Sequence, residues 1–370
     1  AIIHGALTSP VLKKAVAVLS ELLLDYTYEY PCCFASDDVT DLTEFCRIYI
    51  GTRASNDYIL RHSAGELTRE QEYALTVRDE VVTIEGFDDA GVLYGCMDFY
   101  NHYLLMCEYP HNDRYRVNCF EGRLPDFRYR AHPSVRERGL WTWGHVIYDY
   151  RRYLDNMVKL KMNTLIVWND HAPVNAEEMV AYAHACGIKI IWGYAWLWDT
   201  NCKKIALDRL EEHCEEIFEK YEREYSRLGG DGIYFQSVTE LREEAIDGII
   251  IADAVTRFVN KTAALFFEKY PQMELQFGLH ATSVKTKLEY IRAVDPRIRI
   301  VWEDCGSFPF SYIPTDVAQF GQTMDFVDEI ACLRGATDRF GAVTKGLTKL
   351  DWSEFEHTGG AIAMGEGTDK

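Results

Sequence analysis

From position 136 onward, the sequence alternates between short apolar runs and longer segments with apolar residues at helical spacing. This alternation constrains the fold more than any other feature, because it is the signature of βαβ units and therefore of a parallel sheet. Strands are predicted at 138–143, 163–168, 188–192, 232–238, 274–279, 298–302, 326–332 and 360–364. Helices are predicted at 148–160, 176–186, 206–228, 246–270, 284–294 and 342–350, with a weaker one around 316–324. Eight strands with alternating helices predict a (β/α)8 TIM barrel over residues 136–370.

The residues before the barrel predict a small α/β domain at 1–123. Its helices are expected at 10–25 and 90–105, and its strands at 47–51, 73–77 and 81–85. Residues 124–135 are interpreted as an extended connector, because two prolines and alternating arginines neither continue a helix nor match a core strand. The fold class is therefore α/β. The last barrel helix is expected to be missing or replaced, either because the chain is a fragment or because the first domain covers the open flank.

The composition disfavours several kinds of partner. A formal net charge of −19 and a pI near 5.0 argue against nucleic acid and anionic membranes, since both bind basic surfaces. No apolar run approaches the roughly 20 residues that span a bilayer. No signal peptide is visible, which predicts a cytoplasmic protein unless a leader has been removed. The sequence does not indicate the oligomeric state.

Cofactor and metal motifs are also missing from the sequence. The 11 cysteines include no Cys-x-x-Cys pair, and there is no phosphate loop, His-Glu-x-x-His, Gly-x-Ser-x-Gly or dinucleotide fingerprint. We therefore expect no cofactor and no metal. A distant alternative is that His145, His171 and His280 hold a metal with acidic residues, as in amidohydrolase barrels, although the His-x-His pair of that type is absent.

Acidic and aromatic residues gather where the predicted strands end, which is the edge at which barrel enzymes keep their active sites. They include Trp143, Asp170, His171, Trp198, Glu240, His280, Trp302, Glu303, Asp304, Arg334 and Glu366. Taken alone, each tryptophan is more often core and each aspartate more often a helix cap. Together they favour a sugar-cleaving enzyme, because aromatic faces stack on sugar rings and carboxylate pairs cleave glycosidic bonds.

The start of the barrel resembles glycoside hydrolase family 20, the hexosaminidase clan. Arg-Gly-Leu-Trp at 138–141, the helical segment at 148–154 and Lys-Leu-Lys-Met-Asn-Thr-Leu at 159–165 carry the resemblance. The small domain is similar to the non-catalytic domain before the barrel in family 20 and in family 67 α-glucuronidases. The resemblance implies that Glu240 is the general acid and that Arg138 and Glu366 bind sugar hydroxyls. Thr239 stands where family 20 has the aspartate that orients the acetamido group of the substrate.

These features predict an exo-acting glycoside hydrolase of the β-N-acetylhexosaminidase type, acting on an oligosaccharide or glycoconjugate. Glu240 would be the general acid, and Asp304 or Glu303 the second carboxylate. The alternative hypothesis is an α-glucuronidase-like hydrolase. In it, Glu303, Asp304 or Glu329 activates water, and Arg138 or Arg334 holds a sugar carboxylate. A third hypothesis is a carbohydrate-binding barrel that has lost catalysis, since Thr239 replaces the orienting aspartate.

Overall fold

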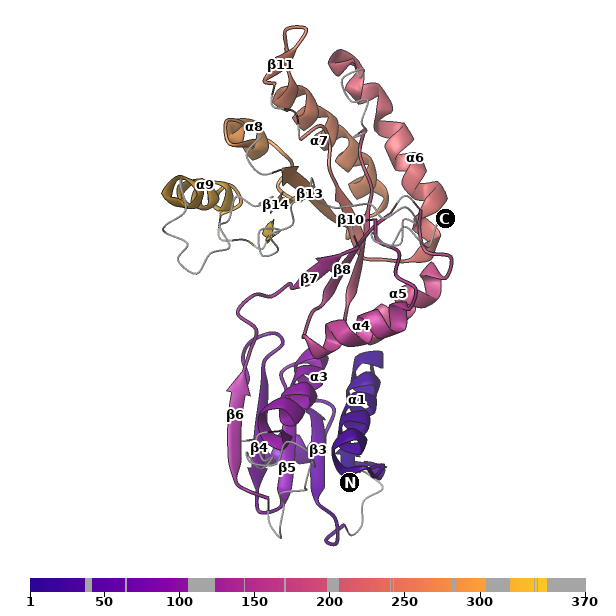
Figure 1. Cartoon of the computed structure of the whole chain (residues 1–370), viewed down its shortest axis with the longest axis vertical. Helices are drawn as coiled ribbons and strands as arrows, with labels where there is room; N and C mark the ends of the chain where they lie inside the picture. The colour runs from indigo at the N-terminus through magenta and orange to yellow at the C-terminus, as the bar shows by residue number, and fades with distance from the viewer. Residues whose placement is uncertain are drawn as a thin grey trace, which may run out of the picture. The chain divides into compact units, whose positions relative to one another are not determined.

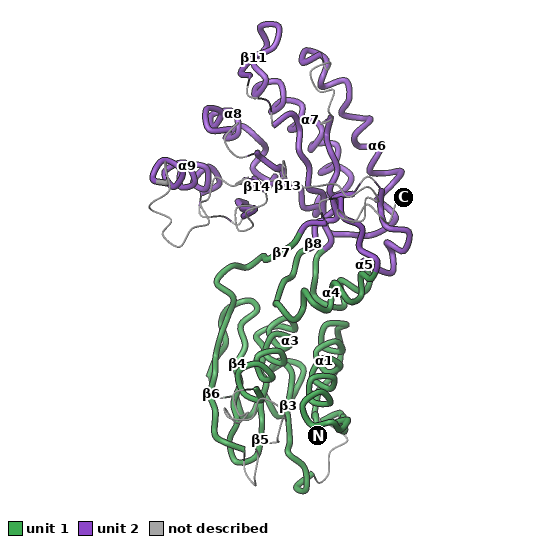
Figure 2. The backbone as a smooth tube through the Cα atoms, viewed as in Figure 1, with its two compact units in different colours: residues 1–140, 149–164, 181–189 green, residues 141–148, 165–180, 190–370 purple. Residues whose placement is uncertain are grey.

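The computed structural model describes residues 1–36, 42–63, 65–105, 124–142, 144–169, 171–197, 206–239, 241, 243–280, 284–303, 320–335, 337 and 339–344. Internal contacts divide the chain into two units (Figure 2). Unit 1 consists of Ala1–Leu140, Asp149–Thr164 and Ala181–Lys189, and unit 2 of Trp141–Tyr148, Leu165–Val180 and Ile190–Lys370. Unit 1 therefore contains the predicted small domain, the predicted connector and part of the predicted barrel.

Unit 1 is built on a mixed six-stranded sheet in the order β2-β1-β3-β5-β4-β6, of which Figure 1 labels β3, β4, β5 and β6. Its strands are β1 (Ile2–His4), β2 (Cys33–Ala35), β3 (Arg47–Thr52), β4 (Tyr73–Arg78), β5 (Val81–Gly86) and β6 (Phe127–Ala131). β1 pairs in parallel with β2 and β3, and β3 with β5, while β4 runs antiparallel to β5 and β6. Its first helices are α1 (Pro10–Thr27), α2 (Asp57–His62) and α3 (Asp89–Asp98), and α3 continues into a π-helical turn, η2 (Phe99–Leu104). The predicted strands and helices of this domain are present, whereas β1, β2 and α2 are too short to show a period.

Local chemistry explains where α1 begins and which face it buries. The Ser9 hydroxyl accepts the backbone N–H of Leu12 at 3.1 Å, and a proline occupies the first helical position, where no N–H partner is needed. Leu12, Ala15 and Leu19 are buried at helical spacing. α1 therefore packs against α3 through one apolar stripe.

The predicted connector 124–135 is corrected by the structure, because part of it forms strand β6. Phe127 and Tyr129 are half-buried, while Arg128 and Arg130 between them are exposed. This alternation with a period of two is that of a strand with one solvated face. Among the described strands, β6 pairs with β4 alone and forms one edge of the sheet, which explains why its sequence does not look like a core strand.

An ion pair ties β6 to the segment before β4. Arg130 donates to the buried Glu72 carboxylate at 2.8 Å, and the backbone N–H groups of Thr68 and Arg69 donate to it at 2.7 and 3.0 Å. Burial opposes ionisation of this carboxyl, but these hydrogen bonds outweigh burial and lower the pKa of Glu72 to about 2. Glu72 is therefore a charge that stabilises the edge of the sheet.

The second sheet is a curled parallel half-barrel with the order β15-β14-β13-β10-β9-β8-β7. Its strands are β7 (Gly139–Trp141), β8 (Thr164–Trp168), β9 (Lys189–Gly193), β10 (Gly232–Phe235), β13 (Glu274–His280), β14 (Arg299–Glu303) and β15 (Phe340–Val343). Six of the predicted barrel strands are thereby confirmed in position and order. The predicted strand at 360–364 lies outside the described residues.

The helices associated with this sheet follow most strands, as in βαβ units. They are α4 (Tyr150–Lys159), α5 (Ala176–Ala185), η4 (Leu207–His213), α6 (Cys214–Glu224), η5 (Ser226–Leu228), α7 (Ile251–Lys269), α8 (Leu288–Arg292) and α9 (Phe320–Cys332). A small hairpin, β11 (Ala245–Ile246) and β12 (Ile249–Ile250), precedes α7. α6 and α7 pack against each other (Figure 1). No helix in the described ranges is both long and apolar enough to cross a membrane.

One predicted strand near the end of the described chain is wrong, because the segment 326–332 is the second half of helix α9. The first two residues of the predicted helix 342–350 belong to strand β15, and its residues 345–350 lie outside the described residues. Thr323, Phe326 and Ile330 are the buried positions of α9, at the spacing i, i+3 and i+7 of a helix. The apolar run Phe-Val-x-x-Ile therefore covers one side of a helix and does not form a buried strand.

One face of the second sheet is covered by aromatic side chains and helices. Phe235 of β10 stacks on Trp196, with ring centroids 3.6 Å apart, and on Phe277 of β13 at 5.0 Å. Phe266 of α7 stacks on Trp196 at 5.6 Å. On β14, Trp302 meets Phe326 of α9 edge to face at 5.7 Å. We call this the helix face, and the opposite side of the sheet the inner face.

We expect Phe326→Ala to lower the free energy of unfolding by about 3–5 kcal/mol, because it removes a buried ring from the contact with Trp302. Glu329→Ala, at an exposed position of the same helix, is the control and should change it by less than about 0.5 kcal/mol. Denaturant unfolding followed by circular dichroism measures both. Equal effects at the two positions would contradict the helical assignment.

A second prediction concerns acid stability. The pKa of Glu72 is about 2 in the folded state and 4.5 in the unfolded chain. The stabilisation that ionised Glu72 provides is therefore complete above pH 4.5 and is lost as the pH falls toward 2. The slope of the unfolding free energy against pH is set by the number of protons taken up on unfolding. Glu72→Gln should lower that number by up to about one in this interval and so make the slope shallower. Glu70→Gln, an exposed neighbour, is the control. The unfolding free energy is measured at several pH values between 2 and 5. If it changes with pH by the same slope in Glu72→Gln and in the unmodified protein, the assignment is contradicted.

Candidate active site

The carboxylate of Glu303 lies at the carboxyl end of β14, on the inner face, and is fully buried. It accepts hydrogen bonds from the hydroxyl of Tyr234 and from the side-chain amide of Gln236. The amide of Gln236 also lies 3.3 Å from the Tyr234 hydroxyl. The strand register places His280 of β13 directly opposite Glu303. Side chains from three strands thus meet at the edge where parallel sheets bind their ligands.

Gly278 allows Tyr234 to reach Glu303. Tyr234 belongs to β10 and Glu303 to β14, and β13 runs between them. A Cβ atom at Gly278 would lie 1.9 Å from the Tyr234 hydroxyl oxygen and 3.0 Å from the Cγ of Gln236. Any other residue at this position would therefore force the hydroxyl away. The missing side chain is what opens a path across β13.

A second glycine, Gly193, makes room for the ring of Trp168, which together with the ring of Trp141 we call the aromatic wall. A Cβ atom at Gly193 would lie 2.7 Å from the Trp168 ring, so this ring can cross β9 only over a glycine. The rings of Trp168 and Trp141 meet the Tyr234 ring edge to face, with centroids 5.6 and 4.8 Å away. Both tryptophans are half-buried. Two tryptophan rings thus contact the tyrosine that donates to the buried Glu303, and aromatic rings and carboxylates are the groups that sugar-cleaving sites use.

The amino end of the inner face is neutralised by its own ion pair. Arg299 of β14 donates to Glu274 of β13 at 2.8 Å, and Gln276 donates to Glu274 at 2.6 Å. Along β14, Val301 lies between Arg299 and Glu303 and belongs to an apolar cluster with Ile166 and Ile191. Glu274 therefore has a structural partner at the amino end, whereas Glu303 lies at the carboxyl end of the same face.

The backbone after β10 is strained. Val238 has φ of 50°, in the left-handed region, which a β-branched residue rarely adopts. Such conformations cost about 1–3 kcal/mol and gather at functional sites. The strain occurs two residues before Glu240, the predicted acid. It is an independent reason to look for function at the end of this strand.

Some predicted site residues lie elsewhere. Trp302 is fully buried on the helix face, so its predicted place in the wall of the site is corrected: its neighbour Glu303 occupies the inner face, and adjacent strand residues point to opposite sides. Thr239 is also buried and lines a cavity of about 30 Å³ together with residues of α7 and α8. His171 is exposed in the segment between β8 and α5.

The two predicted arginines are engaged in structural contacts. Arg138 precedes β7, and its guanidinium donates to the Tyr94 hydroxyl at 3.0 Å, to Gln71 at 2.9 Å and to backbone carbonyls. Arg334 follows α9 and donates to the carbonyls of Val294 at 3.1 Å and Asp295 at 3.4 Å, and burial lowers its pKa. Arg334 was expected at a strand end, but the segment before it is a helix. The structure does not bring either arginine together with Glu303.

Other predicted site residues fall outside the described residues. These are Trp143, Asp170, Trp198, Glu240, Asp304 and Glu366. Of the predicted residues that are described, Glu303 and His280 are brought together. Among the described residues, no group of three or more His, Cys, Asp or Glu side chains is placed to hold a metal.

The sequence interpretation did not include Tyr234, Gln236 or Trp141 among the candidate site residues. The alternation of side chains along the strand could have indicated the first two. Gly232, Tyr234 and Gln236 share one side of the strand, and Ile233 and Phe235 share the other. What it could not show is the lateral reach across β13, which depends on a glycine in another strand.

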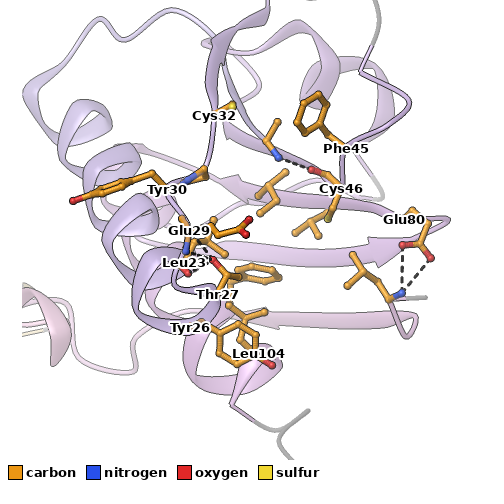
Figure 3. Close-up of a pocket in the computed structure, with 16 residues that line it drawn as sticks. Leu23, Tyr26, Thr27, Glu29, Tyr30, Cys32, Phe45, Cys46, Glu80 and Leu104 are labelled. Carbon is orange, nitrogen blue, oxygen red and sulfur yellow. Dashed lines mark hydrogen bonds between the residues drawn. The ribbon is translucent and has the colours of Figure 1, made fainter. Parts of the chain in front are cut away.

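Unit 1 contains a separate cavity of about 580 Å³ (Figure 3). Its lining is mostly apolar and includes Leu23, Tyr26 and Phe45, with the carboxylates of Glu29 and Glu80. Glu80 is already engaged, since it accepts the backbone N–H of Leu124 at 3.1 Å. This cavity belongs to unit 1, whereas Glu303 and its partners belong to unit 2, and it has no part in the candidate active site.

No family model and no curated protein matches the sequence. The fold is similar to that of CpGH84D, with 15% identity, a TM-score of 0.58, and coverage of 89% of this chain and 54% of the other. It is also similar to that of a GH138 enzyme targeting pectin rhamnogalacturonan II, with 14% identity, a TM-score of 0.56, and coverage of 89% and 51%. Both neighbours are glycoside hydrolases. The chain spans about half the length of each, and at this identity the likeness is one of fold.

The close approach of the Trp168 ring to Gly193 leads to a prediction about the aromatic wall. Gly193→Ala should displace Trp168 and break its edge contact with Tyr234, with a loss of about 1–3 kcal/mol of stability. Gly341→Ala is the matched control, because its added Cβ would meet the nearest atom at an ordinary 3.8 Å. Near-ultraviolet circular dichroism and denaturant unfolding report on the two effects. A spectrum unchanged by Gly193→Ala would contradict the described position of Trp168.

Proposed function

We propose that this chain forms the catalytic part of a glycoside hydrolase with its active site at the carboxyl edge of the parallel sheet. The observation that carries the proposal is the buried Glu303 carboxylate, held by Tyr234 and Gln236 beside the rings of Trp141 and Trp168. The likeness in fold to two glycoside hydrolases supports it. The proposal includes closure of the half-barrel into a complete barrel and an oligosaccharide or glycoconjugate as substrate.

The roles follow from the two-carboxylate chemistry of glycosidases. Glu240 protonates the glycosidic oxygen as the leaving group departs. Glu303 is the second carboxylate, with Asp304 as its alternative, and it either activates water or attacks the anomeric carbon. The two outcomes differ in carboxylate separation, roughly 6.5–9.5 Å for inversion and about 5–5.5 Å for retention.

The position of Thr239 favours this two-carboxylate mechanism over a hexosaminidase-type mechanism. In the latter, a residue beside the acid orients the acetamido group of the substrate. Thr239 lines a cavity among residues of α7 and α8, away from the inner face. We therefore place a uronic-acid or neutral glycoside ahead of an N-acetylhexosaminide among the substrates to test. Exo-action remains part of the proposal.

The test is a panel of aryl glycosides that includes N-acetylhexosaminides and glucuronides. Glu240→Gln and Glu303→Gln should each lower kcat/KM by about 10²- to 10⁴-fold on the responsive substrate, because each removes a group that acts in proton transfer or charge stabilisation. Glu216→Gln, at an exposed position, is the control and should leave it unchanged.

Full activity of Glu303→Gln would refute its assignment as the second carboxylate. Sugar binding without turnover on any substrate would instead support the hypothesis of a binding barrel without catalysis. Calorimetric titration with the corresponding free sugars separates that outcome from a protein that neither binds nor cleaves.

A further inference from the structure

Tyr234 and Glu303 form a contact that is unusual for a parallel sheet, because their strands are not neighbours. Both side chains are fully buried, and the Tyr234 hydroxyl donates to the Glu303 carboxylate across β13. A hydrogen bond from a neutral donor to a carboxylate is strengthened where water is excluded. The contact therefore fixes the side chain of Glu303 at the end of the sheet where the chemistry is proposed.

The same carboxylate oxygen, Oε1, also accepts from Gln236, two residues further along the inner face. The backbone of Gln236 is itself held, since its carbonyl accepts the N–H of Trp196 at 2.9 Å. A Cβ atom at Gly278 would collide with the Tyr234 hydroxyl and crowd the Gln236 side chain. Two donors from β10 and the segment directly after it, together with one glycine of β13, thus orient the Glu303 side chain.

We propose that Tyr234 is a positioning residue, whose hydroxyl, passing over Gly278, holds the Glu303 carboxylate in its reactive orientation. This inference rests on the proposed function, because it gives Tyr234 a role through Glu303. It differs from a role in core packing, since the ring of Tyr234 would fill the same space without the hydroxyl. Tyr234→Phe removes the hydrogen bond and keeps the ring.

The first test does not depend on activity. Crystal structures of Tyr234→Phe and Gly278→Ala should show the Glu303 side chain displaced from its position in the unmodified protein. Gly341→Ala, on the neighbouring strand, should leave it in place, because its Cβ meets no atom closer than 3.8 Å. An unmoved Glu303 side chain in Tyr234→Phe overturns the proposal, whatever the enzyme does.

The second test uses the responsive aryl glycoside. Tyr234→Phe should lower kcat by about 10- to 100-fold, as expected for loss of a hydrogen bond to a charged group, and change KM by less than about threefold. In the Glu303→Gln background, Tyr234→Phe should have no further effect, since its role passes through the carboxylate. A merely structural residue would lower activity by the same factor in both backgrounds, and that result overturns the proposal.

The two proposals fail in different ways. If Glu303→Gln keeps full activity, the proposed function loses its second carboxylate, and the crystal structures still decide whether Tyr234 positions it. If Glu303→Gln is impaired while Tyr234→Phe keeps the full kcat, the proposed function stands and the positioning role is refuted. Thermal unfolding of Tyr234→Phe verifies that it is folded, and Gly278→Ala provides the second variant that displaces the hydroxyl.

Discussion

The absence of two side chains on the inner face is the constraint on which the candidate site depends. Interiors of parallel sheets are close-packed, so a large side chain normally occupies only the space above its own strand. At Gly193 and Gly278 that space is released to neighbours, Trp168 on one side and Tyr234 on the other. The aromatic wall and the anchored carboxylate are both consequences of this lateral packing, and neither would exist with alanine at these positions.

The two carboxylates of the inner face show how partner chemistry separates structure from function. Glu274, at the amino end, lies 2.8 Å from Arg299 and is neutralised by it. Glu303, at the carboxyl end, accepts hydrogen bonds from a hydroxyl and an amide, which fix the direction of its side chain. The ion pair of Glu274 thus lies at the amino end of the face, whereas the donors to Glu303 orient a carboxyl group at the end where the chemistry is proposed.

The sequence predicted the parallel sheet well and its last part poorly, for a physical reason. Runs such as Leu-Ile-Val-Trp in β8, Ile-Ile-Trp in β9 and Ile-Val-Trp in β14 are apolar and rich in β-branched or aromatic residues, and such runs predict buried strands. The run beginning at Phe326 looks the same over a short window, and only burial at Thr323, Phe326 and Ile330 distinguishes a helix. For the site, the error at Trp302 was avoidable, because a strand cannot direct both Trp302 and Glu303 to the same face. The contact between Tyr234 and Glu303 was beyond sequence reasoning, since their strands are not neighbours in the sheet.

The same alternation bears on the chemistry that follows β10. Phe235 and Thr239 both lie on the helix face, and the strained Val238 stands between the strand and the segment that carries the predicted acid. A threonine on the helix face is in the wrong place to orient a substrate group on the inner face. Among the described residues, Thr239 therefore gives no support to a mechanism with an orienting residue beside the acid, whereas the proposed second carboxylate, Glu303, is buried and held by Tyr234 and Gln236. The case for two-carboxylate glycoside cleavage thus depends less on resemblance to any family than on which side of each strand a side chain occupies.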